Sequence, residues 1–526
     1  MTNSFIIKKT GFETVLISLN NTFIKSVGLI TVIAIISKIL GFARELLIAA
    51  YFGASGTTDA FFVASIIPVL MFSAIGMALT TGLVPLYAEA SRAGKKTASS
   101  FMNMLGTLFL VLSIMLSILF YISIPWITTL IAPGFSENEA ELVNSLARIM
   151  IPSFCFYVLS AFMTGILEYE KRFSPPALIA VPQNILVILA VVLFSSRYGI
   201  YSVAVATLLG AISQVIMLYP FFRKYIRFRL NFQFGLYRKK IAETWALFFP
   251  MIAASVAYQI NGVVDRMVAS YLETGSVSAL NFANKLMYLP LSIILLSLIT
   301  VLFPSIIDAF SVQGSRFIDL ISKGFNAIIF VAIPILAVML IENNTLVSLA
   351  FERGAFDHKA ASLTASAFFY YSFGMVFLAL KELLNRCFIA MKEPKVTMKA
   401  SIAAVLVNIL FSILLARLLG TGGIALATSI AMLFQTVYLL VYLRKKLTIE
   451  REHYLSFIKN LSRLLVIFFF TLSAVYAISA LTEGLNHVLQ LILSAACAGI
   501  IFLISSIVLK VEELAWLKER LFKQIR

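Results

Sequence analysis

Residues 24–51 read IKSVGLITVIAIISKILGFARELLIAAY, an apolar stretch that carries Lys38, Arg44 and Glu45 towards its end. A helix needs about 20 mostly apolar residues to cross the hydrocarbon core of a bilayer, and this stretch is long enough. The residues before it contain no short apolar core that leads to a small-residue cleavage site. The stretch is therefore predicted to be a retained membrane-spanning helix.

Similar stretches recur along the whole chain. Of its 526 residues, 60% are hydrophobic and 13% are charged, whereas soluble domains are about half apolar and about a quarter charged. The predicted fold is an all-α polytopic membrane protein with about fourteen transmembrane helices. Prolines inside the runs, such as Pro290, are expected to kink helices without breaking them. The runs lie near residues 24–51, 58–89, 98–128, 141–168, 176–196, 199–222, 242–272, 276–310, 319–341, 360–391, 396–418, 423–444, 456–481 and 485–509.

Lysine and arginine residues occupy alternate loops between these runs. Cytoplasmic loops carry an excess of such residues, so the alternation predicts that both termini face the cytoplasm. The formal charge of +17 is spread over separate loops, which argues against nucleic-acid binding. The basic loops lie near residues 8–25, 92–96, 171–172, 223–240, 316–323, 392–399 and 444–451 and at the C-terminal end, whereas the other loops offer only Arg197, Arg353 and Lys359.

The two halves of the chain repeat a pattern at an offset of about 220 residues. Asn184-Ile185-Leu186 matches Asn408-Ile409-Leu410, and Ala206-Thr207 and Gln214 match Ala427-Thr428 and Gln435. Each half holds an even number of helices, so the halves share one orientation, as in transporters with a cavity between two lobes. We predict two six-helix pseudo-repeat lobes around a central cavity, plus two extra C-terminal helices. The predicted segments are 1–23 (cytoplasmic), 24–222 (first lobe), 223–241 (basic cytoplasmic linker), 242–444 (second lobe), 445–509 (extra helices) and 510–526 (cytoplasmic tail).

Charged residues inside the apolar runs are the candidates for a binding site. An ionisable group within a membrane-spanning helix usually faces a water-filled cavity or a partner. A structural ion pair, or a long side chain that reaches the interface, is the alternative for each. An excess of cations suits phosphate groups. The candidate substrate-binding residues are Lys38, Arg44, Glu45, Asp59, Arg266 and Lys285, and Asp265 either binds a coupling cation or only pairs with Arg266.

Motifs for enzymatic chemistry are missing from the sequence. It contains no Walker A loop, no nucleophile elbow and no cluster of catalytic carboxylates, so the chain is not expected to be an enzyme. The three cysteines, Cys155, Cys387 and Cys497, fall in apolar runs, which leaves no disulfide framework and no zinc spacing. No metal site and no cofactor are expected. The segment Phe351–Phe356 (FERGAF) is an outer-loop motif without catalytic logic of its own.

Several motifs resemble those of a known transporter family. Ser37–Glu45 (SKILGFARE), followed by Phe52-Gly53-Ala54 and Thr58–Ala64 (TDAFFVA), is similar to the opening of the MurJ (MviN) lipid II flippases. Val264-Asp265-Arg266, Gly275–Leu280 and Phe351–Phe356 look like later signatures of that family. The resemblance covers the twelve repeat helices. It implies the fold of the MOP exporter superfamily, with a V-shaped central cavity and two extra helices that form a lipid-facing groove.

The sequence departs from the family pattern in two helices. The acidic and basic pair of the eighth helix appears as Asn284-Lys285, which keeps the cation and loses the acid. After Pro68 the family usually has Asn and two arginines, whereas this chain reads Val69–Gly76 (VLMFSAIG). A flippase for another polyprenyl-linked glycan, of the capsule, teichoic or O-antigen type, therefore stays an alternative.

The resemblance implies a flippase that carries the undecaprenyl-diphosphate-linked peptidoglycan precursor (lipid II) across the bacterial inner membrane by alternating access. In this hypothesis Lys38, Arg44 and Lys285, which come from both repeats, hold the diphosphate where the lobes meet. A coupling cation (Na+ or H+) or the membrane potential drives transport. The expected partners are the polyprenyl-diphosphate-linked saccharide, membrane lipids and cell-wall synthesis proteins. The competing class is a MATE-like exporter of small molecules, which would favour an acidic or aromatic cavity. A scaffold without transport would not need the buried charges.

Overall fold

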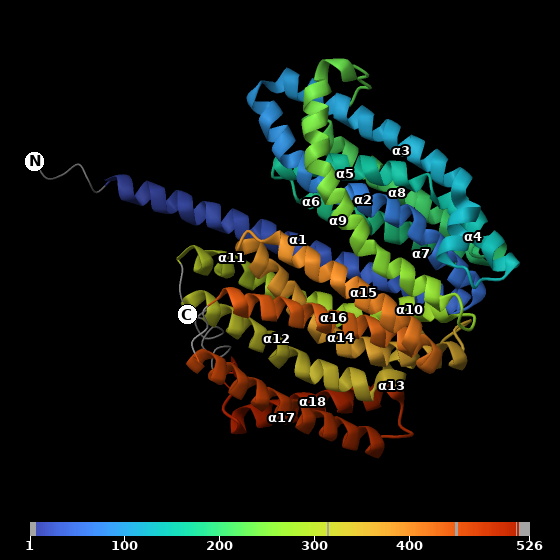
Figure 1. The fold of residues 1–526 in the computed structure, drawn as a ribbon, viewed down its shortest axis with the longest axis vertical. Coiled ribbons are helices and arrows are strands. Elements are labelled where there is room, and N and C mark those ends of the chain that lie inside the picture. The colour runs from blue at the N-terminus through green and yellow to red at the C-terminus, as the bar shows by residue number, and fades with distance from the viewer. Residues whose placement is uncertain (1–6, 313–314, 448–450, 512, 515–526) are drawn as a thin grey trace, which may run out of the picture. The chain divides into compact units, whose positions relative to one another are not determined.

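The described part of the chain consists of helices joined by short connections (Figure 1). The computed structural model describes residues 7–312, 315–447, 451–511 and 513–514, and these ranges contain no β-strand. A 3-10 turn, η1 (Phe234–Tyr237), precedes α9, and a π-helical turn, η2 (Leu291–Leu295), joins α10 to α11. The α-helices are α1 (Ile7–Phe52), α2 (Gly56–Arg92), α3 (Lys95–Ile131), α4 (Glu137–Met150), α5 (Ser153–Tyr169), α6 (Ser174–Leu178), α7 (Ala180–Tyr198), α8 (Tyr201–Phe222), α9 (Arg238–Ala269), α10 (Ser276–Pro290), α11 (Leu296–Val312), α12 (Ser315–Ile341), α13 (Asn343–Phe351), α14 (His358–Ala390), α15 (Pro394–Leu419), α16 (Thr421–Lys446), α17 (Arg451–Leu481) and α18 (His487–Val508).

Most of these helices have the length and composition of membrane spans. Within the described residues, eleven segments are long and apolar enough to cross a bilayer, and α4 with α5, bent by 41°, brings the number to twelve if counted as one span. The chain is thus an all-α multi-pass membrane protein, as the sequence predicted. The two other predicted spans, near residues 24–51 and 242–272, coincide with α1 and α9, which lie outside that count. The number fourteen therefore stays a prediction.

Three of the predicted helices are interrupted, the run at 176–196 only briefly, at Ile179 between α6 and α7. The run at 141–168 is divided into α4 and α5 beside Pro152, and the run at 276–310 is divided by η2 directly after Pro290. Proline removes a backbone donor, and π-helical turns are a recognised cause of kinks. Other prolines, such as Pro304 and Pro334, lie inside helices without ending them. A short extra helix, α13, occupies what was predicted as an outer loop.

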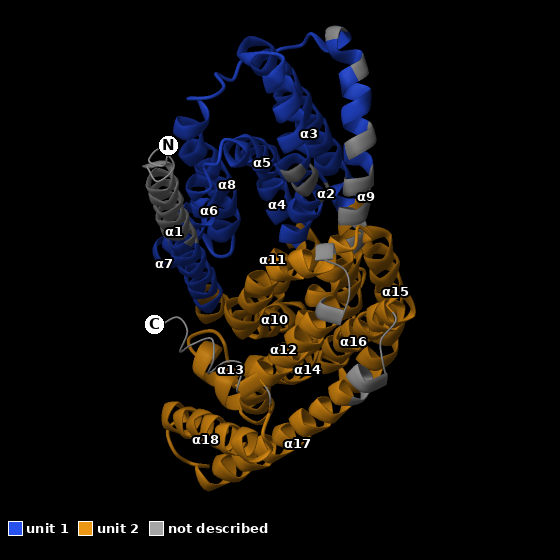
Figure 2. Ribbon diagram, turned by 90° about the vertical axis from the view of Figure 1, so that its left-hand side faces the viewer, with its two compact units in different colours: residues 1–47, 64–125, 144–256 blue, residues 48–63, 126–143, 257–526 orange. Residues whose placement is uncertain are grey.

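The chain forms two compact units, coloured separately in Figure 2. Unit 1 comprises residues 1–47, 64–125 and 144–256. Within it α8 packs against α5 and α7. A Cβ added to Gly210 of α8 would stand 2.6 Å from Gln183 Cγ of α7, so the missing side chain allows this close approach. Small residues serve the same purpose in membrane helix packing generally, because lipid offers little hydrophobic driving force between helices.

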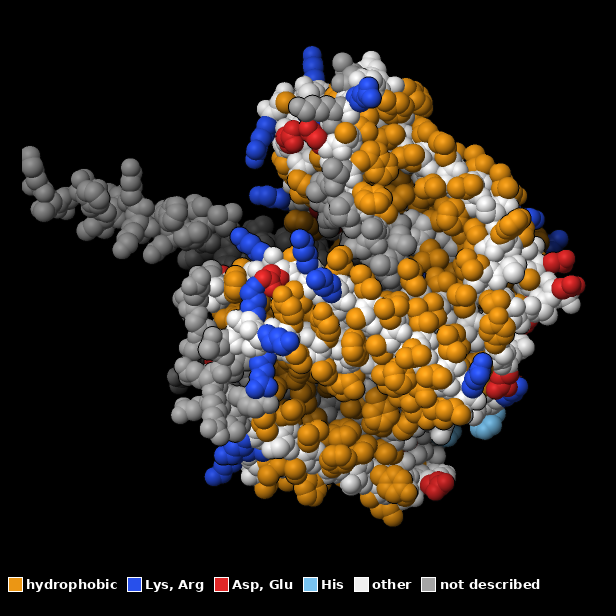
Figure 3. Space-filling view, in the orientation of Figure 1, with side chains coloured by type: hydrophobic (Ala, Val, Ile, Leu, Met, Phe, Trp, Pro, Cys, Tyr) orange, Lys and Arg blue, Asp and Glu red, His pale blue; other side chains and the backbone are white. Residues whose placement is uncertain are grey.

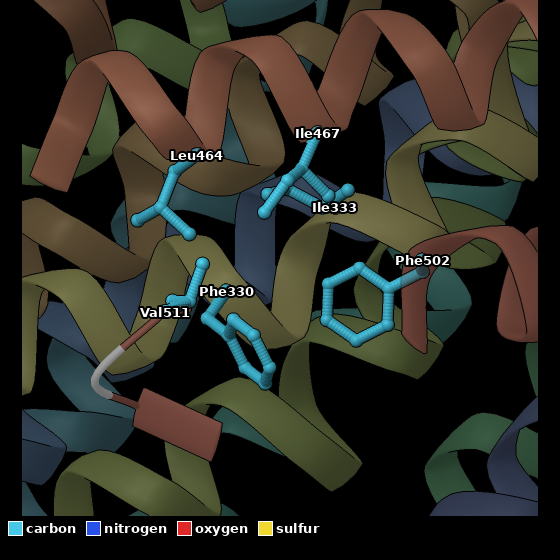
Figure 4. Packing of buried hydrophobic residues seen from close by; sticks show 6 residues of the cluster. All are labelled: Phe330, Ile333, Leu464, Ile467, Phe502 and Val511. Carbon is cyan, nitrogen blue, oxygen red and sulfur yellow. The ribbon is translucent and has the colours of Figure 1, made fainter. Parts of the chain in front are cut away.

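Unit 2 comprises residues 48–63, 126–143 and 257–526. Within it α16 packs against α14 and α15, and α10 packs against α14. The extra helices α17 and α18 pack against α12 around the rings of Phe330 and Phe502, whose centroids are 4.6 Å apart. Figure 4 shows the buried residues of this contact, which are Phe330, Ile333, Leu464, Ile467, Phe502 and Val511.

One face of unit 2 is covered by hydrophobic side chains, with Lys and Arg gathered at one end (Figure 3). Leu406 and Leu418 of α15, for example, are 63% and 78% exposed. The large exposed apolar residues of this helix are Met398, Ile402, Leu406, Leu410, Ile413, Leu414, Leu418 and Leu419. A soluble protein rarely exposes so continuous an apolar surface, whereas a bilayer accommodates it. Contact with lipid therefore explains this face.

The motif Phe351–Phe356 closes onto the end of α1 within unit 2. The backbone N–H of Ala355 donates to the carbonyl of Ala50 at 2.8 Å. Gly354 has a φ of +62°, and a Cβ there would lie against the Ala50 carbonyl oxygen, so glycine is required. The rings of Phe351 and Phe356 both contact Phe282 of α10, with centroids 5.3 and 5.6 Å away. The motif thus holds the connection between α13 and α14 against α1 and α10.

Single cysteines test the predicted orientation of the helices. A cysteine at Asn138 or Glu483, in a chain freed of its native cysteines, should react with an impermeant thiol reagent added outside, because both positions are exposed beside loops poor in cations. A cysteine at Ala93 lies in a basic loop and should react only after permeabilisation. Gly94 and Gly484 are avoided because their φ values of +112° and +93° suit glycine. Reversed labelling at any two positions would refute the topology.

Candidate functional site

An ion pair on α1 forms the centre of a polar cluster in unit 1. Arg44 Nη2 donates to Glu45 Oε1 at 2.6 Å, and Arg44 Nη1 donates to Asn184 Oδ1 of α7 at 3.2 Å. The Glu45 side chain is 3% exposed and that of Arg44 is 26% exposed. Asn184 Nδ2 donates to the backbone oxygen of Ser37 at 3.4 Å. These contacts neutralise a carboxylate that burial in a membrane would otherwise strongly disfavour.

Further polar groups from α5, α7 and α8 continue from Asn184. Gln214 Nε2 donates to Gln183 Oε1 at 2.7 Å, and Gln183 Nε2 donates to the Tyr157 hydroxyl at 2.9 Å. Arg44 Nε and Glu45 Oε2 are buried without a hydrogen-bond partner among the described residues. Buried polar atoms are normally satisfied, so these two atoms keep unused hydrogen-bonding capacity.

Unit 2 contains a cavity of about 300 Å³ lined by residues of α9, α10, α14, α15 and α16. Cavities of roughly this size with a few convergent polar groups are the usual candidates for ligand sites. The charged residues that line it are Asp265, Arg266 and Lys381. The polar and tyrosine residues are Gln259, Asn261, Asn281, Asn284, Tyr288, Tyr371, Ser401, Thr428 and Gln435.

Asp265 is surrounded by polar side chains of α15 and α16. Ser412 Oγ donates to Asp265 Oδ1, and Thr428 Oγ1 donates to Oδ2, each at 3.3 Å. In the amide orientation that satisfies both of its ends, Asn408 donates to Asp265 Oδ1 at 3.1 Å and to Asn261 Oδ1 at 2.7 Å. With the Asn408 amide reversed, its Oδ1 faces Asn261 Oδ1 and Asp265 Oδ1, so three side-chain oxygens converge. The first orientation suits a carboxylate alone, and the second suits a hard cation, which prefers oxygen ligands.

Arg266 and Lys381 bring positive charge to the same cavity. Arg266 Nη1 donates to the carbonyl of Gly262, one turn earlier on α9, at 2.8 Å, and its buried Nε has no partner among the described residues. Within the described residues, no ion pair joins Asp265 to Arg266. Lys381 is 6% exposed at its side chain and pairs with Glu382 at 3.1 Å. A guanidinium with a free donor at a cavity wall is suited to an anionic group.

The clusters of the two units correspond to each other within the repeat. Arg44-Glu45 of α1 and Asp265-Arg266 of α9 lie at the offset of about 220 residues, with the order of charge reversed. Asn184 contacts the first pair, and its repeat partner Asn408 contacts the second. Gly41 also matches Gly262, and Gln214 matches Gln435. Each repeat thus places a charged pair of one helix (α1 or α9) against the amide of an asparagine on another (α7 or α15).

Asp59 lies elsewhere in unit 2, at the N-terminus of α10. Its Oδ1 accepts from Ser278 N at 2.7 Å and from Ser278 Oγ at 2.6 Å, and its Oδ2 accepts from Gly275 N at 2.7 Å. The residue is 2% exposed. A carboxylate here satisfies free N–H groups at the helix start and interacts favourably with the helix dipole. Both oxygens are engaged in joining α2 to α10, so the geometry favours a structural role.

The remaining predicted residues, Lys38 and Lys285, are both exposed, on α1 in unit 1 and on α10 in unit 2. Asn284 lines the cavity of unit 2, whereas its neighbour Lys285 is not among the lining residues. The convergence of Lys38, Arg44 and Lys285 on one diphosphate therefore stays a prediction.

Known proteins are similar in sequence to this chain over most of its length. The profile of a family described as lipid II flippase MurJ matches residues 48–496. This chain belongs to the MurJ family. The probable lipid II flippase MurJ of Buchnera aphidicola subsp. Schizaphis graminum is 30% identical over 500 residues, which cover 91% of this chain and 95% of that protein. The lipid II flippase MurJ of Burkholderia cenocepacia is 29% identical over 426 residues, which cover 78% and 82%.

Solved structures agree with this membership. The structure described as lipid II flippase MurJ in an inward closed conformation matches with a TM-score of 0.78 and 27% identity, and it covers 91% of this chain and 98% of that one. An inward-facing MATE multidrug transporter of the MOP superfamily matches with a TM-score of 0.64 and 14% identity, over 78% and 96% of the two chains. The second likeness shows the shared fold alone. The predicted MurJ family and MOP fold are confirmed.

Several cluster residues were not predicted from the sequence. Asn408 and Thr428 contact Asp265, and Gln435 lines the cavity, yet the sequence marked these three only as repeat matches. Ser412, which also contacts Asp265, carried no signal. The usable signal was a polar side chain kept at matching positions in two apolar halves, because an uncompensated polar group inside a membrane is costly.

A pair of substitutions tests the compensation within the first cluster. Arg44→Ala leaves Glu45 buried without its cation, whereas Arg44→Ala with Glu45→Ala removes both charges. Breaking a buried pair costs several kcal/mol, and the partial exposure of Arg44 reduces this to about 1–3 kcal/mol. We expect the single variant to unfold at lower temperature in detergent and the double variant to recover part of the loss. Lys323→Ala, which breaks the exposed pair with Asp319, is the control and should change little. A fully stable Arg44→Ala would contradict the compensation.

Proposed function

We propose that this chain flips lipid II from the cytoplasmic to the outer leaflet of the bacterial inner membrane by alternating access. The observation that carries the proposal is family membership combined with a charged cluster in each repeat. Relatives over nine-tenths of the chain are named as lipid II flippases. A transporter of an anionic head group needs cations on its membrane helices; Arg44 of α1 and Arg266, which lines the cavity of unit 2, support the proposal.

The diphosphate is the proposed point of recognition. Arg44 is partly exposed and keeps an unsatisfied buried Nε–H, and Lys38 and Lys285 are exposed on their helices. Cations close together repel one another, and a diphosphate bound between them relieves that repulsion. We therefore assign these three residues to the diphosphate and Glu45 to the orientation of Arg44. Asp59 is assigned to the packing of α10.

Asp265 is proposed to bind a coupling cation, either Na+ or a proton. Its support is the convergence of Asn261, Asn408 and Thr428 on Asp265 beside the cavity. The membrane potential is the alternative source of energy, worth about 2.3 kcal/mol per net charge per 100 mV for outward movement of an anion. Loss of Na+-dependent thermal stabilisation in Asp265→Asn, but not in the exposed Asp319→Asn, would support the Na+ form of this proposal. Equal stabilisation by Na+ of the unmodified chain, Asp265→Asn and Asp319→Asn would exclude Na+ binding at Asp265.

A flippase for another polyprenyl-linked glycan remains the second candidate. The stretch Val69–Gly76 carries no charged residue, where the family usually has two arginines. Val69 is 47% exposed, and Met71 is 6% exposed. The loss of two cations changes what the head group would meet, so the sugar portion is the part of the substrate that this departure concerns. Cell-wall synthesis proteins are proposed as partners because they consume the exported precursor.

Rescue of a bacterium depleted of its MurJ protein tests the function. We expect this chain to restore growth, and we expect Arg44→Lys to fail at normal abundance. The lysine keeps the charge beside Glu45 but loses the planar set of donors that reaches both Glu45 and Asn184. Lys323→Ala is the control and should rescue fully. Failure of the unmodified chain, together with tight binding of another polyprenyl-diphosphate glycan, would favour the second candidate.

Binding of defined lipids tests the substrate class. The purified protein should be stabilised by polyprenyl-diphosphate lipids more than by their monophosphate counterparts, because two phosphates satisfy more cationic donors. Thermal unfolding in detergent, or native mass spectrometry, provides the measurement. The preference should shrink in Lys38→Gln and in Lys285→Gln and persist in Lys323→Ala. Equal stabilisation by diphosphate, monophosphate and an uncharged polyprenol would show that these cations do not form the ligand site.

A further inference from the structure

The connection between α8 and α9 is held along α3 in unit 1, where it passes one end of that helix (Figure 2). Asn103 of α3 makes two hydrogen bonds to the backbone of the connection. Its Nδ2 donates to the Arg227 carbonyl at 3.2 Å, and its Oδ1 accepts from the Arg229 N–H at 3.3 Å. Thr107 Oγ1 accepts from the Asn231 N–H at 2.9 Å. Asn103 and Thr107, one turn apart on α3, therefore satisfy backbone groups of the connection with their side chains.

Side-chain contacts extend this attachment at both ends. Asn231 Nδ2 donates to the Ser100 carbonyl at 3.1 Å, and the Tyr237 hydroxyl donates to Ser100 Oγ at 3.1 Å. Arg172 Nε donates to the Tyr225 hydroxyl at 3.2 Å. The Phe228 ring lies over Gly106, where an added Cβ would stand 2.7 Å from it. The connection is thus fixed to unit 1 over most of its length.

The attachment leaves cations and large apolar side chains on the outside. Leu230 and Phe232 are 60% and 61% exposed. No ion pair engages the Arg227 or Arg229 side chains among the described residues. The exposed cations of the connection and of the adjoining helix start are Arg223, Lys224, Arg227, Arg229 and Arg238. Cations beside exposed apolar groups are the composition of segments that lie on anionic membranes.

The level of the connection along α3 matches the edge of the bilayer. At 1.5 Å per residue the 37 residues of α3 extend about 55 Å, well beyond a hydrocarbon core of about 30 Å. Its large exposed apolar residues run from Ile114 to Leu130, so Ser100–Thr107 lie below that stretch, towards the basic end at Lys95. Tyr219 and Phe221, at the end of α8, are 43% and 42% exposed, as expected of aromatic residues at an interface.

We propose that the segment Arg223–Phe234 docks onto the anionic phospholipid surface of the inner leaflet. Arg227 and Arg229 contact lipid phosphates, and Leu230 and Phe232 insert at the boundary between head groups and acyl chains. Because Asn103 and Thr107 already hold the backbone, docking orders little additional chain and loses little conformational entropy. The chain that connects the two repeats is thereby attached both to α3 and to the membrane.

Fluorescence quenching in nanodiscs tests this surface. In a chain freed of its native cysteines, an environment-sensitive dye on Phe232→Cys should be blue-shifted and quenched by nitroxide lipids in discs that contain phosphatidylglycerol, and much less in discs of phosphatidylcholine alone. Arg227→Gln with Arg229→Gln should reduce the docked fraction, with a change of about thirtyfold in the docking equilibrium. High salt should act in the same direction. The discs contain no polyprenyl lipid, so a positive result assigns the surface to phospholipid.

Matched variants separate docking from general charge. Lys395→Gln with Lys399→Gln removes two exposed cations from the basic end of α15 and should leave the quenching at residue 232 unchanged. Asn103→Ala removes the attachment to α3 without altering charge, and it should lower quenching because the freed segment samples more conformations. Thermal unfolding checks that each variant is folded. A dye that is equally exposed to water in both lipid compositions, or unaffected by the double arginine variant, would overturn the proposal.

Discussion

The Glu45 carboxylate is 3% exposed on a membrane helix and is neutralised by Arg44, the next residue in the chain. The two side chains meet on α1 itself, and a second guanidinium nitrogen of Arg44 reaches another helix. Asn184 of α7 accepts from the guanidinium and donates to the backbone of α1. Compensation of a buried charge therefore contributes to the contact between α1 and α7 in unit 1.

Unit 2 meets the same need with the opposite order of charge. Asp265 is contacted from α15 and α16, whereas the adjacent Arg266, among the described residues, bonds to its own helix alone and lines the cavity. In unit 2 the acid, Asp265, is therefore contacted by neutral polar groups, and the cation, Arg266, keeps an unpartnered Nε–H among the described residues. In unit 1 the cation itself is the partner of the acid. The repeat thus yields two charged clusters with different arrangements, a direct ion pair in unit 1 and a separated acid and cation in unit 2.

Polar contacts also attach the parts of unit 2 that lie outside the repeat. Glu342, 1% exposed, accepts from Thr345, Gln490 and Ser494, which come from α13 and α18. Such a carboxylate is satisfied by several donors and needs no ion pair. Together with the apolar contact around Phe330 it holds α17 and α18 against α12. Helix association in lipid depends on close packing and on polar contacts of this kind.

The sequence by itself determined the fold class and the family, and it singled out the charged residues inside the apolar runs. Apolar runs predict spans because backbone groups in lipid must be satisfied within the helix, which is a local requirement. The same logic identified Arg44, Glu45, Asp265 and Arg266 as exceptional, since charge inside such a run requires a reason. The opening motif also indicated the family correctly.

Only the tertiary structure decided what each charge does. Asp59 and Glu45 look alike in sequence, yet Asp59 binds the N–H groups at the start of α10 while Glu45 pairs with Arg44. The π-helical turn after Pro290 and the attachment of residues 227–231 to α3 were likewise not predicted. Each depends on which groups from distant parts of the chain lie within about 3 Å of one another. Apolar periodicity carries no information about that distance, because it reports only which face of a helix avoids water.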